Sequence, residues 1–168
     1  TVRNITAKAT VLATGGMGKV YLFNTNSEIA TGDGYAMAYR VGAELINMEY
    51  TQFHPTTLYH PLKKNFLLSE SLRGEGAIIV NHKGERFLFK FDPRGELAPR
   101  DIVTRGIISE LTSTGQECVF LDASKIGSKE KIRSRFPTIY QTLESIGIDM
   151  STDLIPIVPA FHFQCGGV

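Results

Sequence analysis

The segment Gly95–Leu111 constrains this chain most, because a permanent cation falls on the apolar stripe of a helix there. Proline suits the first position of a helix, so we expect a helix from about Pro99 to Thr112. The apolar positions recur at helical spacing and predict one face turned toward a core: Val103, Ile107 and Leu111, with Ile108 beside them. At ~100° per residue, Arg100 falls within the same stripe.

Arg100 conflicts with two local rules. Burial disfavours its charge, and the positive end of the helix dipole disfavours a cation at the helix start. Such conflicts are typical of functional sites. One resolution is an anionic ligand beside Arg100, held also by the free N–H groups of the helix start. The other is a structural ion pair with Asp92, Glu96 or Asp101, and the sequence leaves both open.

The composition indicates a soluble globular protein. The chain has 168 residues, 42% of them hydrophobic and 21% charged, with a net charge of +1, which gives no bias toward nucleic acid or membrane. We find no apolar run long enough for a membrane span. Cys118 and Cys165 form no metal-binding spacing, so we expect reduced thiols in the cytoplasm. The chain opens as if within a strand and closes as if within a loop, so we expect a segment of a longer protein.

The first part of the chain has a strand–glycine pattern. Two extended segments are expected in it, the second buried around Val11–Ala13. Glycines follow at Gly15 and Gly16, which let the backbone approach a ligand closely, although an ordinary strand-ending turn is the alternative. A helix is expected over 35–45, with Asp33 either capping it or contacting a ligand.

The remaining chain alternates short strands with helical pieces. We expect a strand over 49–59 that breaks at Pro55, and later a proline-containing extended segment that leads to His162. Between them we expect a helical turn in 67–76, a hairpin turning at Lys83-Gly84, a strand at 118–122, and helices at 129–136 and 138–146.

Three side chains in separate pieces of the chain are candidate donors to one anion. These are His54, Arg100 and His162. Arginine offers a planar fork that matches a carboxylate, so donors that converge would suit a dicarboxylate substrate. A lone histidine is more often a structural residue, and spacing alone does not show convergence.

The ordered motifs resemble the flavoprotein family of succinate dehydrogenase, fumarate reductase and L-aspartate oxidase. The resemblance covers essentially the whole chain and rests on Ala13-Thr-Gly-Gly16, Thr31-Gly-Asp-Gly34, Gln52-Phe-His-Pro-Thr56, Glu70-Ser-Leu-Arg-Gly-Glu-Gly76, Arg100-Asp101, and His162 ahead of Cys165-Gly-Gly167. Within this family, the stretches Arg86–Arg100, Phe136–Tyr140, Gly147–Asp149 and Val158–His162 are most similar to L-aspartate oxidases.

The resemblance implies an α+β fold. The end of an α/β FAD-binding domain would be followed by the mixed α+β capping domain of the fumarate reductase flavoprotein type. Residues 1–48 would be the C-terminal part of the FAD-binding segment, residues 49–157 the capping domain that closes over the substrate, and residues 158–168 the return to the FAD-binding domain.

The resemblance also implies roles for individual residues. Ala13, Thr14, Gly15, Gly16 and Asp33 would lie at the FAD cofactor. His54 and His162 would hold the substrate carboxylates, and Ser69 and Glu70 match a Thr-Glu pair at the substrate. Arg100 would be the proton-transfer arginine, either as a transient relay or as a stabiliser of developing negative charge, since a guanidinium does not readily give up its proton.

The implied function is FAD-dependent oxidation of L-aspartate to iminoaspartate in NAD biosynthesis, in the cytoplasm, with fumarate or oxygen as electron acceptor. The alternative is a succinate dehydrogenase or fumarate reductase flavoprotein subunit, and a non-catalytic module with a structural Arg100 ion pair is a third. Implied partners are the dicarboxylate substrate, the missing N- and C-terminal parts of the parent chain, and quinolinate synthase. We expect the segment to be inactive alone, because no GxGxxG follows a strand in it.

Overall fold

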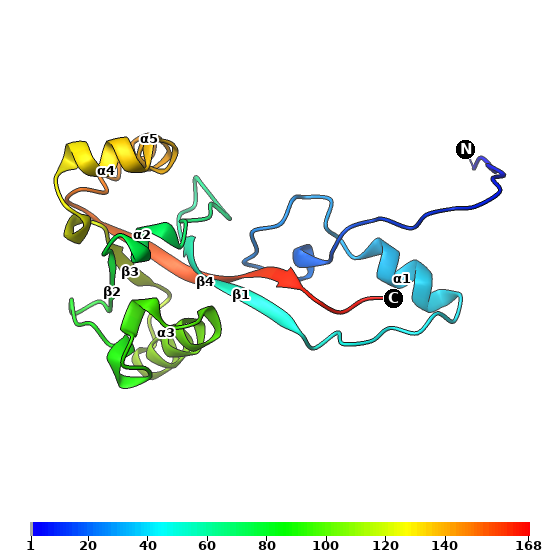
Figure 1. Ribbon diagram of the computed structural model, residues 1–168, viewed down its shortest axis with the longest axis horizontal. Helices are drawn as coiled ribbons and strands as arrows, with labels where there is room; N and C mark the ends of the chain where they lie inside the picture. Colours follow the sequence, from blue (N-terminus) through cyan, green and yellow to red (C-terminus); the bar gives the residue numbers. More distant parts are fainter. Residues whose placement is uncertain (1) are drawn as a thin grey trace.

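A four-stranded antiparallel sheet organises the computed structural model, which describes residues 2–168. Its strands are β1 (Thr51–Leu58), β2 (Ile78–Val80), β3 (Val119–Asp122) and β4 (Leu154–Gln164), in the spatial order β1-β4-β3-β2. The long β4 pairs with β3 through its first residues and with β1 along the rest, and it runs from the end of the molecule near α4 to about its middle (Figure 1). The expected α+β class is confirmed.

Pro55 lies within β1 and does not break it, so this prediction was wrong. His54 pairs with Ala160, and Thr57 pairs with Val158, with a register shift between the two. A proline cannot donate to the ladder, and a local irregularity of pairing accommodates it without ending the strand. The strand therefore carries His54 deep into the molecule, where its side chain is 1% exposed.

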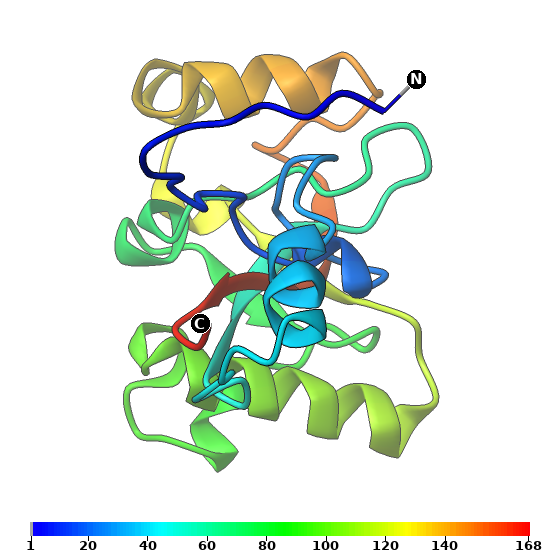
Figure 2. The same cartoon turned by 90° about the vertical axis from the view of Figure 1, so that its right-hand side faces the viewer.

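Helices cover both sides of this sheet. α3 (Arg100–Thr114) packs against β1, while α4 (Lys129–Arg135) and α5 (Pro137–Glu144) lie on the opposite side (Figures 1 and 2). The shorter pieces are α1 (Asp33–Arg40), α2 (Ser71–Gly74) and the 3-10 turns Gly18–Val20, Leu88–Lys90, Gly95–Leu97 and Ser124–Ile126. Within residues 2–168, the structure contains no helix with the length and apolar character needed to cross a membrane.

The core lies between the sheet and the helices. Val103 and Ile107 are fully buried, as predicted for the stripe of α3, whereas Ile108 is 49% exposed and does not belong to it. One residue further along a helix turns the side chain by about 100°, which carries Ile108 off the packed face. Leu121 of β3 and Leu143 of α5 complete the same cluster.

Most elements between residues 67 and 168 agree with their predictions. The helical turn, the strand β3, the two helices divided at Pro137 and the extended segment leading to His162 are all present. The hairpin turn is also confirmed, since Gly84 N–H donates to Asn81 O and Val80 bridges to Arg86. These elements have local signals, such as apolar periodicity and turn residues.

The N-terminal part differs from expectation. Val11 is 87% exposed, so the predicted burial of this extended segment was wrong within the described chain. An extended segment becomes a buried strand only when a sheet pairs with it and another layer covers it. α1 is also shorter than expected, since it ends at Arg40 and Gly42 follows with φ 82°. Gly42 therefore follows the helix and does not lie in its interior.

The segment after β4 returns to the N-terminal part of the chain. Ile46 and Gly167 exchange two backbone hydrogen bonds, and the C-terminal end lies beside α1 (Figure 2). A side chain at Gly166 would clash with this arrangement, because its Cβ would lie 2.1 Å from Asn47 O. The fold thus unites sequence segments that lie more than 100 residues apart.

Truncating the centre of the core tests this packing. Leu121→Ala should lower the free energy of unfolding by about 2–5 kcal/mol, because a fully buried leucine leaves a cavity. Urea denaturation of the full-length protein measures the change. Leu97→Ala is the matched control: Leu97 is 64% exposed, and a change of about 0.5 kcal/mol or less is expected. Equal effects of the two substitutions would contradict the described core.

Candidate active site

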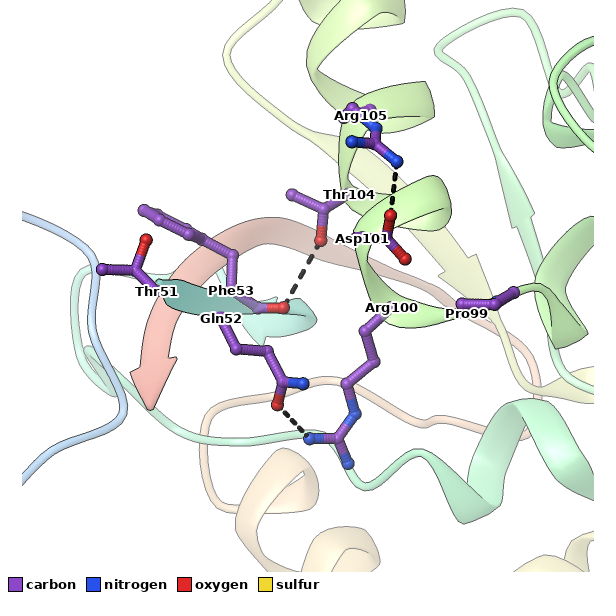
Figure 3. Close-up of a pocket in the computed structure, with 8 residues that line it drawn as sticks. All are labelled: Thr51, Gln52, Phe53, Pro99, Arg100, Asp101, Thr104 and Arg105. Carbon is purple, nitrogen blue, oxygen red and sulfur yellow. Dashed lines mark hydrogen bonds and ion pairs between the residues drawn. The ribbon is translucent and has the colours of Figure 1, made fainter. Parts of the chain in front are cut away.

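Arg100 is the first residue of α3, and its guanidinium is held by two other segments. Its Nε donates to Glu70 Oε2 at 2.8 Å, and its Nη2 lies 2.7 Å from the same oxygen. Its Nη1 donates to Gln52 Oε1 at 3.0 Å, which Figure 3 shows. The side chain keeps 29% of its surface exposed. The cation is therefore fixed in position but still reachable from solvent.

Glu70, and not one of the three expected carboxylates, is the ionic partner of Arg100. The three carboxylates pair elsewhere: Asp92 with Arg94, Glu96 with Arg86, and Asp101 with Arg105. Each of these three partnerships lies within ten residues of sequence, whereas Glu70 lies 30 positions from Arg100. The three expected carboxylates lie close to Arg100 in sequence. The observed partner, Glu70, comes from a distant segment that the tertiary fold brings close.

His54 and His162 lie on paired strands and their rings face each other. The ring centroids are 5.5 Å apart, and His54 is buried whereas His162 is half-buried. Burial and then the charges of Arg100 and Arg73 lower the pKa of His54 to about 3. Burial and the charge of Arg100 also lower the pKa of His162. The structure thus brings the three predicted donors into one region, with two neutral rings beside one cation.

The tautomer of His54 follows from its backbone contact. Thr56 N–H donates to His54 Nδ1 at 3.3 Å, so Nδ1 is an acceptor. A neutral imidazole with an accepting Nδ1 carries its proton on Nε2. His54 can therefore donate one hydrogen bond from Nε2 to an anion, as a neutral donor.

Glu70 lies between two arginines. Its Oε1 is 3.6 Å from Arg73 Nη2, while its Oε2 contacts Arg100. Burial alone would raise the pKa of Glu70, but the hydrogen bond from Arg100 and the charges of both arginines outweigh burial and lower it. Arg73 itself is 2% exposed, and its Nη1 donates to Glu96 O at 2.6 Å. Glu70 is therefore a stable carboxylate that connects a buried cation to an accessible one.

Sequence reasoning missed Arg73 and Gln52. The i,i+3 spacing of Glu70 and Arg73 on a helical turn was a usable signal, because residues at that spacing are neighbours. Gln52 had no such signal, since its contact with Arg100 spans 48 positions. Ser69, which was predicted, uses its hydroxyl locally: Ser71 N–H donates to Ser69 Oγ at 3.2 Å, which stabilises the start of α2.

An open hollow of roughly 440 Å³ lies beside the guanidinium (Figure 3). Its walls are Thr51, Gln52, Phe53, Pro99, Arg100, Asp101, Thr104 and Arg105. The two histidines do not line it. Arg100 therefore borders this hollow, and its charge also acts on the rings of His54 and His162.

The glycine motif near residue 15 lines a second hollow, of roughly 420 Å³. Ala13, Thr14 and Gly15 line it together with Gly34 and Gly167. A Cβ at Gly34 would lie 1.8 Å from Thr14 Oγ1, so only glycine permits this approach. The other two predicted residues do not line it: Gly16 O accepts from Gly32 N–H at 3.2 Å, and Asp33 is the exposed first residue of α1. This backbone cradle fits an extended ligand such as a nucleotide cofactor.

Comparison with known proteins identifies the family. The family model described as FAD binding domain matches residues 1–168. The chain belongs to the FAD-binding domain family. It is 53% identical to the L-aspartate oxidase of Yersinia pestis over 99% of its length, and 54% identical to L-aspartate oxidase 1 of Ralstonia nicotianae over 99%. It spans 31% of the length of each of these relatives.

Solved structures of related flavoproteins agree with this membership. Escherichia coli quinol fumarate reductase superposes with a TM-score of 0.80 at 35% identity, over 93% of this chain and 29% of the other. Mycobacterium smegmatis Sdh1 superposes with a TM-score of 0.80 at 41% identity, over 96% and 28%. The predicted fold of the fumarate reductase flavoprotein type is confirmed. FAD is the cofactor of this family, and the glycine cradle is compatible with it.

The depressed pKa of His54 is directly measurable. Its ordinary value of 6.5 falls to about 3, so the ring should remain unprotonated from pH 8 to pH 5 in a histidine-selective NMR titration. Between pH 6.5 and pH 3, the His54 ring takes up a proton in the unfolded chain but not in the folded one. The free energy of unfolding should therefore fall as the pH is lowered through this range. His54→Gln identifies the signal.

The variant Arg100→Gln provides the matching test. Removing this cation should raise the pKa of both histidines, because its charge lowers both in the native protein. If the His54 ring titrates near 6.5 in the unmodified protein, the described burial is wrong.

Proposed function

We propose that this chain contains the capping domain of an enzyme of NAD biosynthesis. The enzyme oxidises L-aspartate to iminoaspartate with FAD, and the capping domain closes over the substrate. The observation that carries the proposal is the Arg100–Glu70 ion pair set beside two neutral histidines. The similarity to L-aspartate oxidases at 53% identity supports the choice of substrate. Residues 1–48 and 158–168 then belong to the FAD-binding part, and residues 49–157 form the capping domain.

The donors suit a dicarboxylate. A substrate with two carboxylates needs cationic and neutral donors around both ends, because unpaired buried charge is costly. Arg100 supplies the cation, while His54 and His162 supply neutral N–H donors without adding charge. We assign Ser69 and Glu70 to the same site, because Glu70 contacts Arg100 and Ser69 precedes Glu70 in the chain.

The cofactor residues are Ala13, Thr14, Gly15, Gly16 and Asp33. The first three form the wall of the glycine-lined hollow, where backbone N–H groups can approach a phosphate or ring edge closely. When bound, FAD accepts the hydride that leaves the substrate Cα. The protein's contribution is to hold the substrate with that carbon in reach and to exclude water when the capping domain closes.

Oxidising the Cα–N bond to an imine also releases a proton. Arg100 is a poor base on its own, since a guanidinium holds its proton firmly. Its Nη2 lies 2.7 Å from Glu70 Oε2, so Arg100 can take a substrate proton while one of its own moves to Glu70. Glu70 is 46% exposed through its side chain and can release the proton to water. Arg73, 3.6 Å away, keeps Glu70 ionised between turnovers.

A succinate dehydrogenase or fumarate reductase flavoprotein is the second candidate. The superposition on the quinol fumarate reductase at a TM-score of 0.80 favours it, because the same donors would hold succinate. The two candidates differ at one atom, since aspartate carries an amine where succinate carries hydrogen.

The proposal also covers the partner enzyme, the cellular compartment and the electron acceptor. Imines hydrolyse in water, so an enzyme that consumes iminoaspartate is a fitting partner, and quinolinate synthase is our candidate. We place the enzyme in the cytoplasm, where thiols such as Cys118 and Cys165 stay reduced. Fumarate and oxygen are both candidate electron acceptors.

The substrate test is anaerobic reduction of the flavin in the full-length, FAD-loaded protein. L-aspartate should bleach the flavin absorbance within one turnover and yield ammonia after hydrolysis of the imine, whereas succinate should bleach it at least about 100-fold more slowly. Bleaching by succinate and not by aspartate would replace the leading function with the second candidate. Bleaching by neither would reject both.

Arg100 and Glu70 should affect turnover more than binding. Arg100→Lys should lower kcat for aspartate by about 10³-fold or more, because lysine lacks the fork that contacts Glu70 and Gln52 together. Glu70→Gln should lower kcat by about 10²-fold or more, because an amide does not accept the proton. Steady-state kinetics at matched FAD content measure both. The control Arg133→Lys, at an exposed position of α4 that lines neither hollow, should leave kcat within about twofold.

A further inference from the structure

The segment 23–25 extends the sheet at the position of His162. Phe161 N–H donates to Phe23 O at 2.9 Å, and Thr25 N–H donates to Phe161 O at 2.9 Å. These bonds form a short parallel bridge on the edge of β4 that β3 leaves free, since β3 pairs only as far as Ile157. A loop from the N-terminal part of the chain is thereby fixed against the strand that carries His162.

Two side chains of this loop hold His162. Thr25 Oγ1 lies 2.6 Å from His162 Nδ1, and Asn26 Nδ2 donates to His162 O at 2.9 Å. Thr25 therefore contacts the ring and Asn26 contacts the backbone of the same residue. Asn26 in turn packs against Gly18, where an added Cβ would lie 2.2 Å from Asn26 Oδ1. This close packing limits where the loop can lie.

The hydroxyl proton of Thr25 has one good acceptor. The alternative acceptor is Phe161 O at 3.5 Å, which is too long for a normal O–H···O bond. A hydroxyl that donates to His162 Nδ1 at this distance requires that nitrogen to be unprotonated. A neutral imidazole with an accepting Nδ1 carries its proton on Nε2, as His54 does. In the described part of the chain, no hydrogen bond engages His162 Nε2, so this N–H is available to a ligand.

We propose that Thr25 is a positioning residue that fixes His162 as the Nε2–H tautomer, so that the ring donates to a substrate carboxylate. The choice of a dicarboxylate rests on the proposed function; the tautomer does not. Without the hydroxyl, Nδ1 loses its donor and the two tautomers come closer in energy. The Nδ1–H form would present a lone pair at Nε2 to an anion, and that form does not bind a carboxylate.

The lowered pKa of His162 agrees with this role. Burial and Arg100 keep the ring neutral at neutral pH, so its tautomer, and not its charge, decides whether it donates. A neutral donor adds hydrogen bonding without more positive charge beside Arg100 and Arg73. Thr25 would thus connect the proposed cofactor-binding part of the chain to His162, the proposed substrate-binding residue on β4.

The test compares Thr25→Val with Thr25→Ser in the full-length, FAD-loaded protein. Valine keeps the shape of threonine without the hydroxyl, and serine keeps the hydroxyl. Selective ¹⁵N-histidine NMR reports whether Nδ1 or Nε2 carries the proton, with His162→Gln identifying the signal. Fumarate binding, followed by flavin absorbance, and aspartate kinetics give the functional readouts. Equal FAD content and melting temperature show that each variant is folded.

In the unmodified protein and in Thr25→Ser, the proton should reside on Nε2. In Thr25→Val, the Nδ1 signal should shift toward the protonated form, the Kd for fumarate should rise by about tenfold, and KM for aspartate should rise more than kcat falls. Nδ1 protonated in the unmodified protein, or an unchanged tautomer and unchanged Kd in Thr25→Val, would overturn the proposal. The NMR result stands whichever substrate proves correct, so failure of the proposed function is distinguishable from failure of this inference.

Discussion

The contact between Arg100 and Glu70 is the interaction on which the site depends. It joins the first residue of α3 to the start of α2, across 30 positions of sequence. It also resolves the conflict of a cation at a helix N-terminus, because the carboxylate neutralises the charge where the helix dipole disfavours it. Burial, and then that charge, lowers the pKa of both histidines and keeps them neutral donors. The charge balance of the site therefore follows from one ion pair and its buried neighbour Arg73.

β4 is the element that makes one site out of distant segments. Along one edge it pairs with β1, which carries Gln52 and His54, and its own C-terminal half carries His162. On its other edge, beyond β3, it pairs with the loop that carries Thr25. The same strand then leads back to the glycine-lined hollow through Gly167. A single long strand thus connects the glycine-lined hollow to the proposed substrate donors.

Locally encoded elements were predicted well. α3, α5 and β3 follow from apolar periodicity, and the hairpin turn follows from Lys83-Gly84. The failures share one cause, which is that a partner was needed from elsewhere. Val11 is exposed because burial of a strand needs neighbouring layers, and β1 continues through Pro55 because β4 shifts register there. Turn residues and apolar periodicity predict the secondary structure of a segment. Its burial depends on which other segments pack against it.

The candidate site divides in the same way. The residue types were legible in the chain: an arginine on an apolar stripe, two histidines in extended segments and glycines after a strand, together with the family motifs that contain them. Their contacts were not, because Glu70 and Gln52 reach Arg100 across 30 and 48 positions, and Thr25 reaches His162 across 137. Side-chain identity supplies the chemistry that a residue can perform. Its pKa, tautomer and ion-pair partner depend on burial and distance, and those quantities exist only once the chain has folded.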